Sequence, residues 1–177
     1  MQNKTQVFPL PGSIFVHNRL THSLEVSSVG RSLGADVSRE LIARHPELAD
    51  TEVTSLGAIV SAACLAHDMG NPPFGHSGER AIRTYFSEGK GNRLHDLVTE
   101  DGTDLSEAEW QDMIRFDGNA NTFRLLTHQF NGRRRGCFVM TYATLASIVK
   151  YPYGYDRATR KPMFGFFESE RHTCLLI

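Results

Sequence analysis

Two adjacent residues with metal-ligating side chains, His67 and Asp68, stand at the end of an apolar segment. A second pair of proton-handling residues, His76 and Glu79, follows after a short loop rich in Gly and Pro, and His22 lies upstream. Imidazole and carboxylate groups are suitable ligands for divalent Mg, Mn, Fe, Co or Zn. This layout is typical of a metal-dependent hydrolase.

The geometry of a helix limits how His67 and Asp68 can share one ion. Neighbouring residues on a regular helix point about 100° apart, so the two side chains can converge only near a helix end, a position that Gly70 supports. His22 would come from another helix, and metal sites in all-α proteins are commonly built between packed helices. Taken singly, His22 fits a hydrogen-bonded core histidine, and Asp68 fits a helix-end cap. Their combination with His76 and Glu79 favours the metal site.

Helical periodicity supplies the elements that would position these side chains. Apolar residues recur at steps of three to five, polar residues lie between them, and no alternation is strong enough for a sheet. We therefore predict an all-α fold of one domain over residues 1–177. Three stretches read as loops: 1–18, 87–105 and 153–167. The expected helices span about 20–43, 52–67, 77–86, 106–116, 121–130 and 141–149, with Ser77, Ser106 and Thr141 as N-caps.

Bulk composition excludes several classes of protein. The 177 residues are 40% hydrophobic and 22% charged, with a formal net charge of -1, so no overall charge favours nucleic acid or membranes. Three scattered cysteines do not suggest a disulfide framework and favour a reducing cytoplasm. The sequence has neither an apolar run of membrane-spanning length nor the pattern of a signal peptide.

Four segments carry a resemblance to a known family. They are Arg19-Leu20-Thr21-His22-Ser23-Leu24-Glu25-Val26, Leu65-Ala66-His67-Asp68-Met69-Gly70-Asn71-Pro72-Pro73-Phe74-Gly75-His76, Phe116-Asp117-Gly118-Asn119-Ala120-Asn121, and Thr141 to Leu145 with Lys150-Tyr151-Pro152. Together they resemble the HD superfamily of metal phosphohydrolases. More narrowly, they resemble its deoxynucleoside triphosphate triphosphohydrolases of the dGTPase type. The pair His-Asp is a weak signal, but the continuation GNPPFGHSGE is highly specific.

The resemblance implies an all-α fold that cleaves a dNTP to a deoxynucleoside and inorganic triphosphate. It implies a metal, Mg or Mn above all, held by His22, His67, Asp68 and a distal Asp. The distal Asp of the family lies on a later helix, and Asp156 is a poor substitute because it falls in an irregular segment. We therefore expect this chain to be truncated at its C-terminus, and its N-terminus to be short as well.

The resemblance also implies that His76 and Glu79 are catalytic. Glu79 lies three residues after His76, so on a helix the two side chains share nearly the same face, and the carboxylate would orient the imidazole. Glu79 could instead be a first-turn carboxylate favoured by the helix dipole, and both roles can coexist.

Three further positions match substrate-binding residues of the family. Arg19 would contact phosphate, Lys150 with Tyr151 would lie near the polyphosphate, and Asn119 falls in the matching Gly-Asn-Ala segment. The alternatives are a solvated arginine, a lysine at a helix C-terminus and a turn asparagine. Phe74 could wall the nucleoside pocket, although we expect a core aromatic.

Partners follow mainly from the resemblance, which implies a dNTP substrate and a homo-oligomer. The cluster Arg133-Arg134-Arg135 could bind an effector nucleotide or single-stranded DNA, but a solvated loop is favoured. Two other functions stay open. One is another HD phosphohydrolase, which the pair His76 and Glu79 argues against. The other is a non-catalytic nucleotide-binding or oligomerisation module, which the missing distal Asp supports.

Overall fold

The computed structural model describes residues 1, 4–5, 18–98, 104–132, 137–158 and 163–177, and these form helices joined by loops, with no β-sheet among them. The predicted all-α class is confirmed. The predicted entry loop over 1–18 lies mostly outside the described residues, and the Arg133–Arg135 cluster lies outside them entirely. The α-helices are α1 (Arg19–Arg44), α2 (Leu56–Ala66), α3 (His76–Ser87), α4 (Glu107–Ile114), α5 (Gly118–Thr127), α6 (Tyr142–Ile148) and α7 (Arg171–Leu175).

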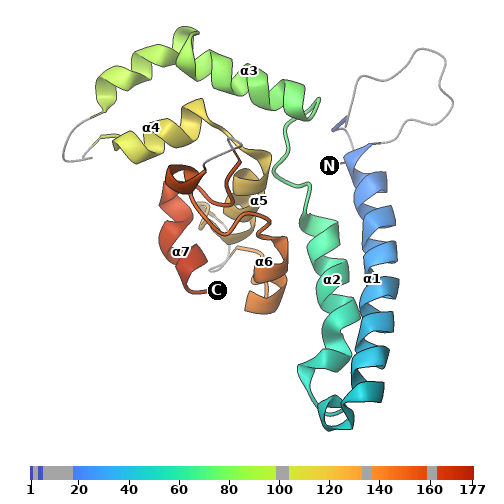
Figure 1. The fold of residues 1–177 in the computed structure, drawn as a ribbon. Coiled ribbons are helices and arrows are strands. Elements are labelled where there is room, and N and C mark those ends of the chain that lie inside the picture. Colours follow the sequence, from blue (N-terminus) through green and yellow to red (C-terminus); the bar gives the residue numbers. More distant parts are fainter. Residues whose placement is uncertain (2–3, 6–17, 99–103, 133–136, 159–162) are drawn as a thin grey trace, which may run out of the picture.

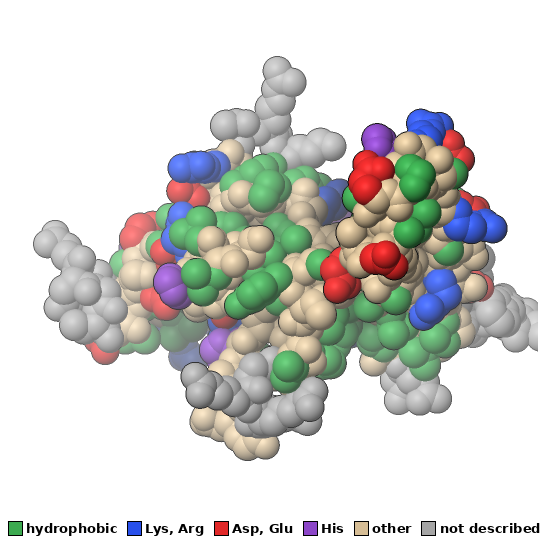
Figure 2. All heavy atoms as spheres, turned by 90° about the horizontal axis from the view of Figure 1, so that it is seen from below, with side chains coloured by type: hydrophobic (Ala, Val, Ile, Leu, Met, Phe, Trp, Pro, Cys, Tyr) green, Lys and Arg blue, Asp and Glu red, His purple; other side chains and the backbone are tan. Residues whose placement is uncertain are grey.

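Helices α1 and α2 form an antiparallel hairpin that extends away from the other helices (Figure 1). Short 3₁₀ turns over Pro46–Leu48 and Glu52–Ser55 connect them. Small residues allow the close packing: a Cβ added at Gly34 would lie 2.9 Å from the Cα of Gly57. Seen end-on in Figure 2, the hairpin shows acidic and basic side chains intermixed rather than gathered by sign.

Local capping explains where several helices begin. Asn18 accepts hydrogen bonds from the backbone of Leu20 and Thr21 and begins α1, and Thr141 accepts one from Thr144 and begins α6. The predicted capping box at Ser106 and Glu109 is present at α4. Such caps satisfy backbone N–H groups that have no partner within the helix.

Three details of the predicted secondary structure are wrong. Helix α3 begins at His76, because Gly75 (φ 55°) rather than Ser77 is its N-cap. The predicted loop over 87–105 contains a 3₁₀ helix at Lys90–Leu97. The predicted break at Gly118 is instead the first turn of α5, which Asp117 caps by accepting the Asn119 N–H, and the helix ends at Thr127.

The apolar core lies where α5, α6 and the C-terminal segment meet the end of α2. Its buried members are Ala66, Phe123, Leu126, Leu145 and Phe166. Cys174 and Ile177 pack against this cluster, whereas Leu175 and Leu176 are exposed. The core thus holds the C-terminal end of α2, which His67 follows directly, against α5, α6 and the C-terminal segment.

Candidate metal centre

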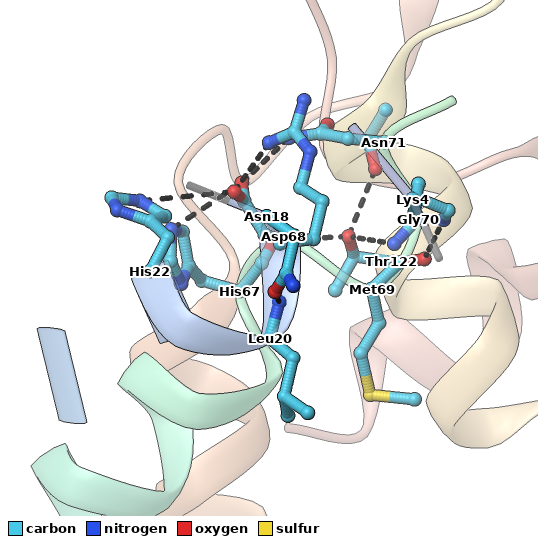
Figure 3. Close-up of polar contacts among 12 residues, drawn as sticks. Lys4, Asn18, Leu20, His22, His67, Asp68, Met69, Gly70, Asn71 and Thr122 are labelled. Carbon is cyan, nitrogen blue, oxygen red and sulfur yellow. Dashed lines mark hydrogen bonds and ion pairs between the residues drawn. The ribbon is translucent and has the colours of Figure 1, made fainter. Parts of the chain in front are cut away.

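Three predicted metal ligands converge in the structure. His22 lies in the first turns of α1, while His67 and Asp68 follow the last residue of α2. The candidate ligand atoms of these three residues all lie within 4.8 Å of one another. Figure 3 shows the two imidazoles side by side, facing the carboxylate of Asp68. The predicted position at a helix end is confirmed.

The hydrogen bond of His67 fixes which of its nitrogens can bind a metal. Its Nδ1 lies 2.6 Å from the backbone oxygen of Cys64, and this nitrogen donates because the carbonyl can only accept. The Nε2 atom is left with its lone pair, 3.3 Å from Asp68 Oδ1. Metal-binding histidines commonly have this arrangement, in which the second ring nitrogen is held by a carbonyl or carboxylate.

Asp68 is the shared centre of the cluster, and its residue is only 6% exposed. Its Oδ2 contacts Arg19 Nη1 and lies 3.8 Å from His22 Nε2, while its Oδ1 accepts a 2.6 Å hydrogen bond from Asn71 Nδ2. The buried guanidinium compensates the charge of the buried carboxylate, as a low-dielectric site requires. The donor set of two imidazoles and one carboxylate fits a divalent cation.

The loop after α2 is tied to the start of α5, and this connection fixes the orientation of His67 and Asp68. Gly70 N donates to Thr122 Oγ1 at 2.9 Å, and Asn121 Nδ2 donates to Gly70 O at 2.7 Å. Thr122 is fully buried and its hydroxyl lies 3.1 Å from His67 O. Asn71 and Thr122 were not predicted as site residues. The position of Asn71 in the specific loop motif was the available signal, whereas nothing in the sequence indicated Thr122.

His76 and Glu79 form the predicted pair at the start of α3. His76 Nδ1 lies 2.8 Å from Glu79 Oε2, and the other oxygen of Glu79 accepts the Gly118 N–H at 3.0 Å. The glutamate side chain is 10% exposed and the histidine side chain 77%. The carboxylate is therefore held on both sides, and it leaves His76 Nε2 at an accessible position.

A pocket of about 630 Å³ brings two residues of the metal cluster, His67 and Asp68, together with this pair. His67, Asp68, His76 and Glu79 line it, as do the predicted substrate residues Asn119, Lys150 and Tyr151. Lys150 Nζ lies 5.5 Å from the centre of the Tyr151 ring. Asn119 is oriented by Asp117, whose Oδ1 accepts its side-chain amide at 2.8 Å. This volume is within the usual range of small-molecule sites.

Arg19 and Phe74 belong to an adjoining pocket of about 340 Å³, which also contains His76 and Glu79. The expectation of a core role for Phe74 is wrong, because this residue is 42% exposed and has φ 66°. It follows Pro72 and Pro73 in the sharp turn before α3. Phe74 thus lies in the wall of the adjoining pocket and not in the core.

Comparison with known proteins agrees with this geometry. Residues 19–100 match the family model described as HD domain. A deoxyguanosinetriphosphate triphosphohydrolase-like protein of Pseudomonas aeruginosa is 47% identical over 175 residues, which cover 94% of this chain and 37% of that protein. A protein of the same description from Synechocystis is 44% identical over 97% of this chain and 40% of its own length.

A deoxyguanosinetriphosphate triphosphohydrolase of Yersinia pestis is 34% identical over 97% of this chain and 38% of that protein. The chain thus spans about two fifths of the length of these relatives. The matched segment includes the metal cluster and the His76–Glu79 pair.

Proposed function

We propose that this chain, whose residues 19–100 match the HD-domain family model, carries the metal site of a dNTP triphosphohydrolase. The products would be a deoxynucleoside and inorganic triphosphate. The observation that carries this proposal is the shared pocket, in which the cluster of His67 and Asp68 meets the pair of His76 and Glu79. The similarity to a deoxyguanosinetriphosphate triphosphohydrolase of Yersinia pestis supports a substrate such as dGTP.

The reaction would join a water oxygen to the α-phosphorus and break the bond from that phosphorus to the 5′ oxygen of the deoxynucleoside. His22, His67 and Asp68 would hold the cation. A divalent cation in such a site lowers the pKa of bound water and neutralises charge on phosphoryl oxygens. Mg or Mn is favoured, and Fe, Co or Zn also fits these ligands.

His76 would move the proton that this reaction requires. Its Nδ1 is engaged by Glu79, so Nε2 is the atom that exchanges a proton with the substrate. Glu79 stabilises the charged imidazolium and is itself fixed by the Gly118 N–H. The departing 5′ oxygen must gain a proton as the phosphorus–oxygen bond breaks, and an imidazole is well suited to this near neutral pH.

The negative charge of the substrate's triphosphate requires basic side chains elsewhere in the walls of the two pockets. Lys150 lines the main pocket and Arg19 the adjoining one, so the polyphosphate would extend between them. Arg19 already contacts Asp68, and it would keep the carboxylate in place while it approaches a phosphate oxygen. Asn119 and Tyr151 would complete the contacts to the substrate.

The described chain also bears on the location of the protein. No helix of the described chain is long and apolar enough to cross a membrane. All three cysteines are among the described residues and no disulfide joins them, which supports a reducing cytoplasm. The resemblance supports a homo-oligomer, and the cluster Arg133-Arg134-Arg135 is the candidate for contact with an effector nucleotide or single-stranded DNA.

Product identification tests the proposal. We expect the chain, incubated with each dNTP and Mn or Mg, to release inorganic triphosphate that can be identified by ³¹P NMR. His76→Ala should lower this rate about 100-fold or more and leave Mn binding unchanged in calorimetry. His45→Ala, an exposed histidine at the hairpin tip, should behave as the unmodified chain does. Release of phosphate or pyrophosphate instead would refute the assignment.

A second function has one observation in its favour. Within the described residues, the metal cluster has three ligand residues, and no fourth His, Cys, Asp or Glu joins it. A non-catalytic nucleotide-binding module would retain such a site. It predicts that dGTP binds with Mn in calorimetry while no product forms over hours of incubation.

A further inference from the structure

A separate cavity lies among α3, α4, α5 and the segment before α7, and it shares no lining residue with the two pockets of the metal centre. Its volume is about 340 Å³. Small-molecule sites begin at about 300 Å³, so this cavity has room for a single ring system. In Figure 1, α4 and α7 lie on the side of the molecule opposite to the α1–α2 hairpin.

Asp112 on α4 lines this cavity and has an unusual hydrogen-bonding state. The residue is 6% exposed, and its Oδ2 accepts the backbone N–H of Glu168. Its Oδ1 is buried and receives no hydrogen bond from the described residues. Buried polar atoms nearly always have a partner, so this oxygen lacks a donor that a ligand in the cavity could provide.

The walls around Asp112 are aromatic and apolar. Phe86 comes from α3, Phe116 follows α4, and Phe167 comes from the C-terminal segment. The rings of Phe116 and Phe167 are 5.9 Å apart, and Met113 adds a flexible apolar contact. Aromatic faces bind flat apolar groups and attract cations.

The charges around the cavity select the sign of a ligand. Glu109 lines it beside Asp112, whose pKa is raised first by burial and then by the nearby carboxylates of Glu168 and Glu170. Arg124 lines the cavity, but it pairs with buried Glu170 at 2.7 Å, and the nearby Arg171 pairs with Glu168 at 2.8 Å. A phosphate or carboxylate would therefore be repelled, and a cation would be attracted.

We propose that this cavity binds a small organic cation with a flat apolar body, of the aryl amidine or aryl guanidine class. The ring would lie against the aromatic wall formed by Phe86, Phe116 and Phe167, and an N–H group would donate to Asp112 Oδ1. The proposal is independent of the phosphohydrolase reaction, because the cavity and the metal centre have no lining residue in common.

Benzamidine is the appropriate probe for the 177-residue chain. We expect saturable one-site binding in calorimetry and, in ¹⁵N-resolved NMR, shifts confined to the end of α3, α4, α5 and the segment around Phe167. At pH 8, above the pKa of about 7 of Asp112, Asp112→Asn should weaken binding about 10-fold or more, because hydrogen bonds to a charged group contribute more than neutral ones. Glu107→Gln, an exposed acid on the same helix, should leave binding unchanged.

Two ligand controls and one further variant make the test decisive. Benzamide has the same shape without the charge and should bind at least 10-fold more weakly, while benzoate should not bind. Phe116→Leu preserves an apolar wall without its aromatic face, and should weaken benzamidine binding while the dispersed NMR spectrum shows that the fold persists. Equal affinity in Asp112→Asn, or equal binding of benzoate, would overturn the proposal.

Discussion

At the scale of single residues, Asp68 connects the other residues of the metal centre. One buried carboxylate contacts an arginine and an asparagine and lies within 4 Å of both imidazoles. Each of its oxygens therefore already has a polar neighbour. A bound cation would share the charge of Asp68 with Arg19, so the arginine limits how tightly the cation is held while it keeps the carboxylate oriented.

Asp112 gives a prediction about pH and stability. Burial raises the pKa of its carboxyl from 3.8 to about 7, and Glu168 and Glu170 add to this effect while the Glu168 N–H and Arg171 oppose it. Between these two pKa values the folded chain binds a proton that the unfolded chain has lost. The contribution of Asp112 to the free energy of unfolding is thus lost as pH rises from about 4 to about 7.

We expect Asp112→Asn to remove this part of the pH dependence. From pH 5 to pH 8, the free energy of unfolding of the unmodified chain should fall by roughly 1–3 kcal/mol relative to that of the variant. Urea unfolding at each pH measures the difference, and Glu107→Gln is the control. Parallel pH profiles for the unmodified chain and Asp112→Asn would show that Asp112 titrates normally in the folded state.

At the scale of elements, the contact between the loop after α2 and the start of α5 holds the metal ligands in place. Gly70 has no room for a side chain, since an added Cβ would lie 2.0 Å from the backbone nitrogen of Thr122. We expect Gly70→Ala to lower the free energy of unfolding by about 3 kcal/mol or more, as overpacking against backbone does. It should also weaken Mn binding, because Asp68 and His67 precede this contact.

The control for this change is Gly132→Ala, in open space at φ 75°. That variant should lose only about 1 kcal/mol, from backbone strain alone, and should keep its Mn affinity. Urea unfolding and Mn calorimetry measure both variants. If Gly70→Ala were as stable as Gly132→Ala, the loop after α2 would not lie as close to α5 as the structure shows.

The helices also show which features a sequence can predict. The caps of α1, α4 and α6 depend on residues a few positions apart, and the starts of α4 and α6 were predicted from Ser106 and Thr141. Gly118 was interpreted as a break, but it begins α5 for a tertiary reason: a Cβ there would lie 2.0 Å from Asn71 Oδ1. Contacts between distant segments have no signature in one sequence.

The same limit applies to the metal centre. His22, His67 and Asp68 were predicted to converge, because ligand types and helix ends are visible in the sequence, and this convergence is confirmed. The hydrogen bond of His67 to Cys64 and the burial of Thr122 were not predicted. Both depend on how α2 ends and how α5 packs on it.

At the scale of the whole molecule, the metal ligands lie where α1 begins and α2 ends. Figure 1 shows that this is the end of the hairpin from which the chain continues to the remaining helices. The metal ligands belong to the hairpin and the residues just after it, whereas His76, Asn119 and Lys150 come from later elements. A cation would therefore join α1 to the end of α2, and a nucleotide in the pocket would join the hairpin to the later helices.

This arrangement predicts that a bound cation stabilises the whole fold. A ligand at 100 times its Kd adds about 2.7 kcal/mol to the free energy of unfolding. For a chain of this length 1 kcal/mol corresponds to roughly 2–4 °C in Tm. Saturating Mn should therefore raise Tm by about 5–10 °C in a calorimetric scan, and EDTA should reverse the rise. His67→Ala should reduce the rise to about 1 °C, while His45→Ala keeps it. An equal rise in His67→Ala would place the bound cation elsewhere, because a site without His67 would lose the link between α1 and the end of α2.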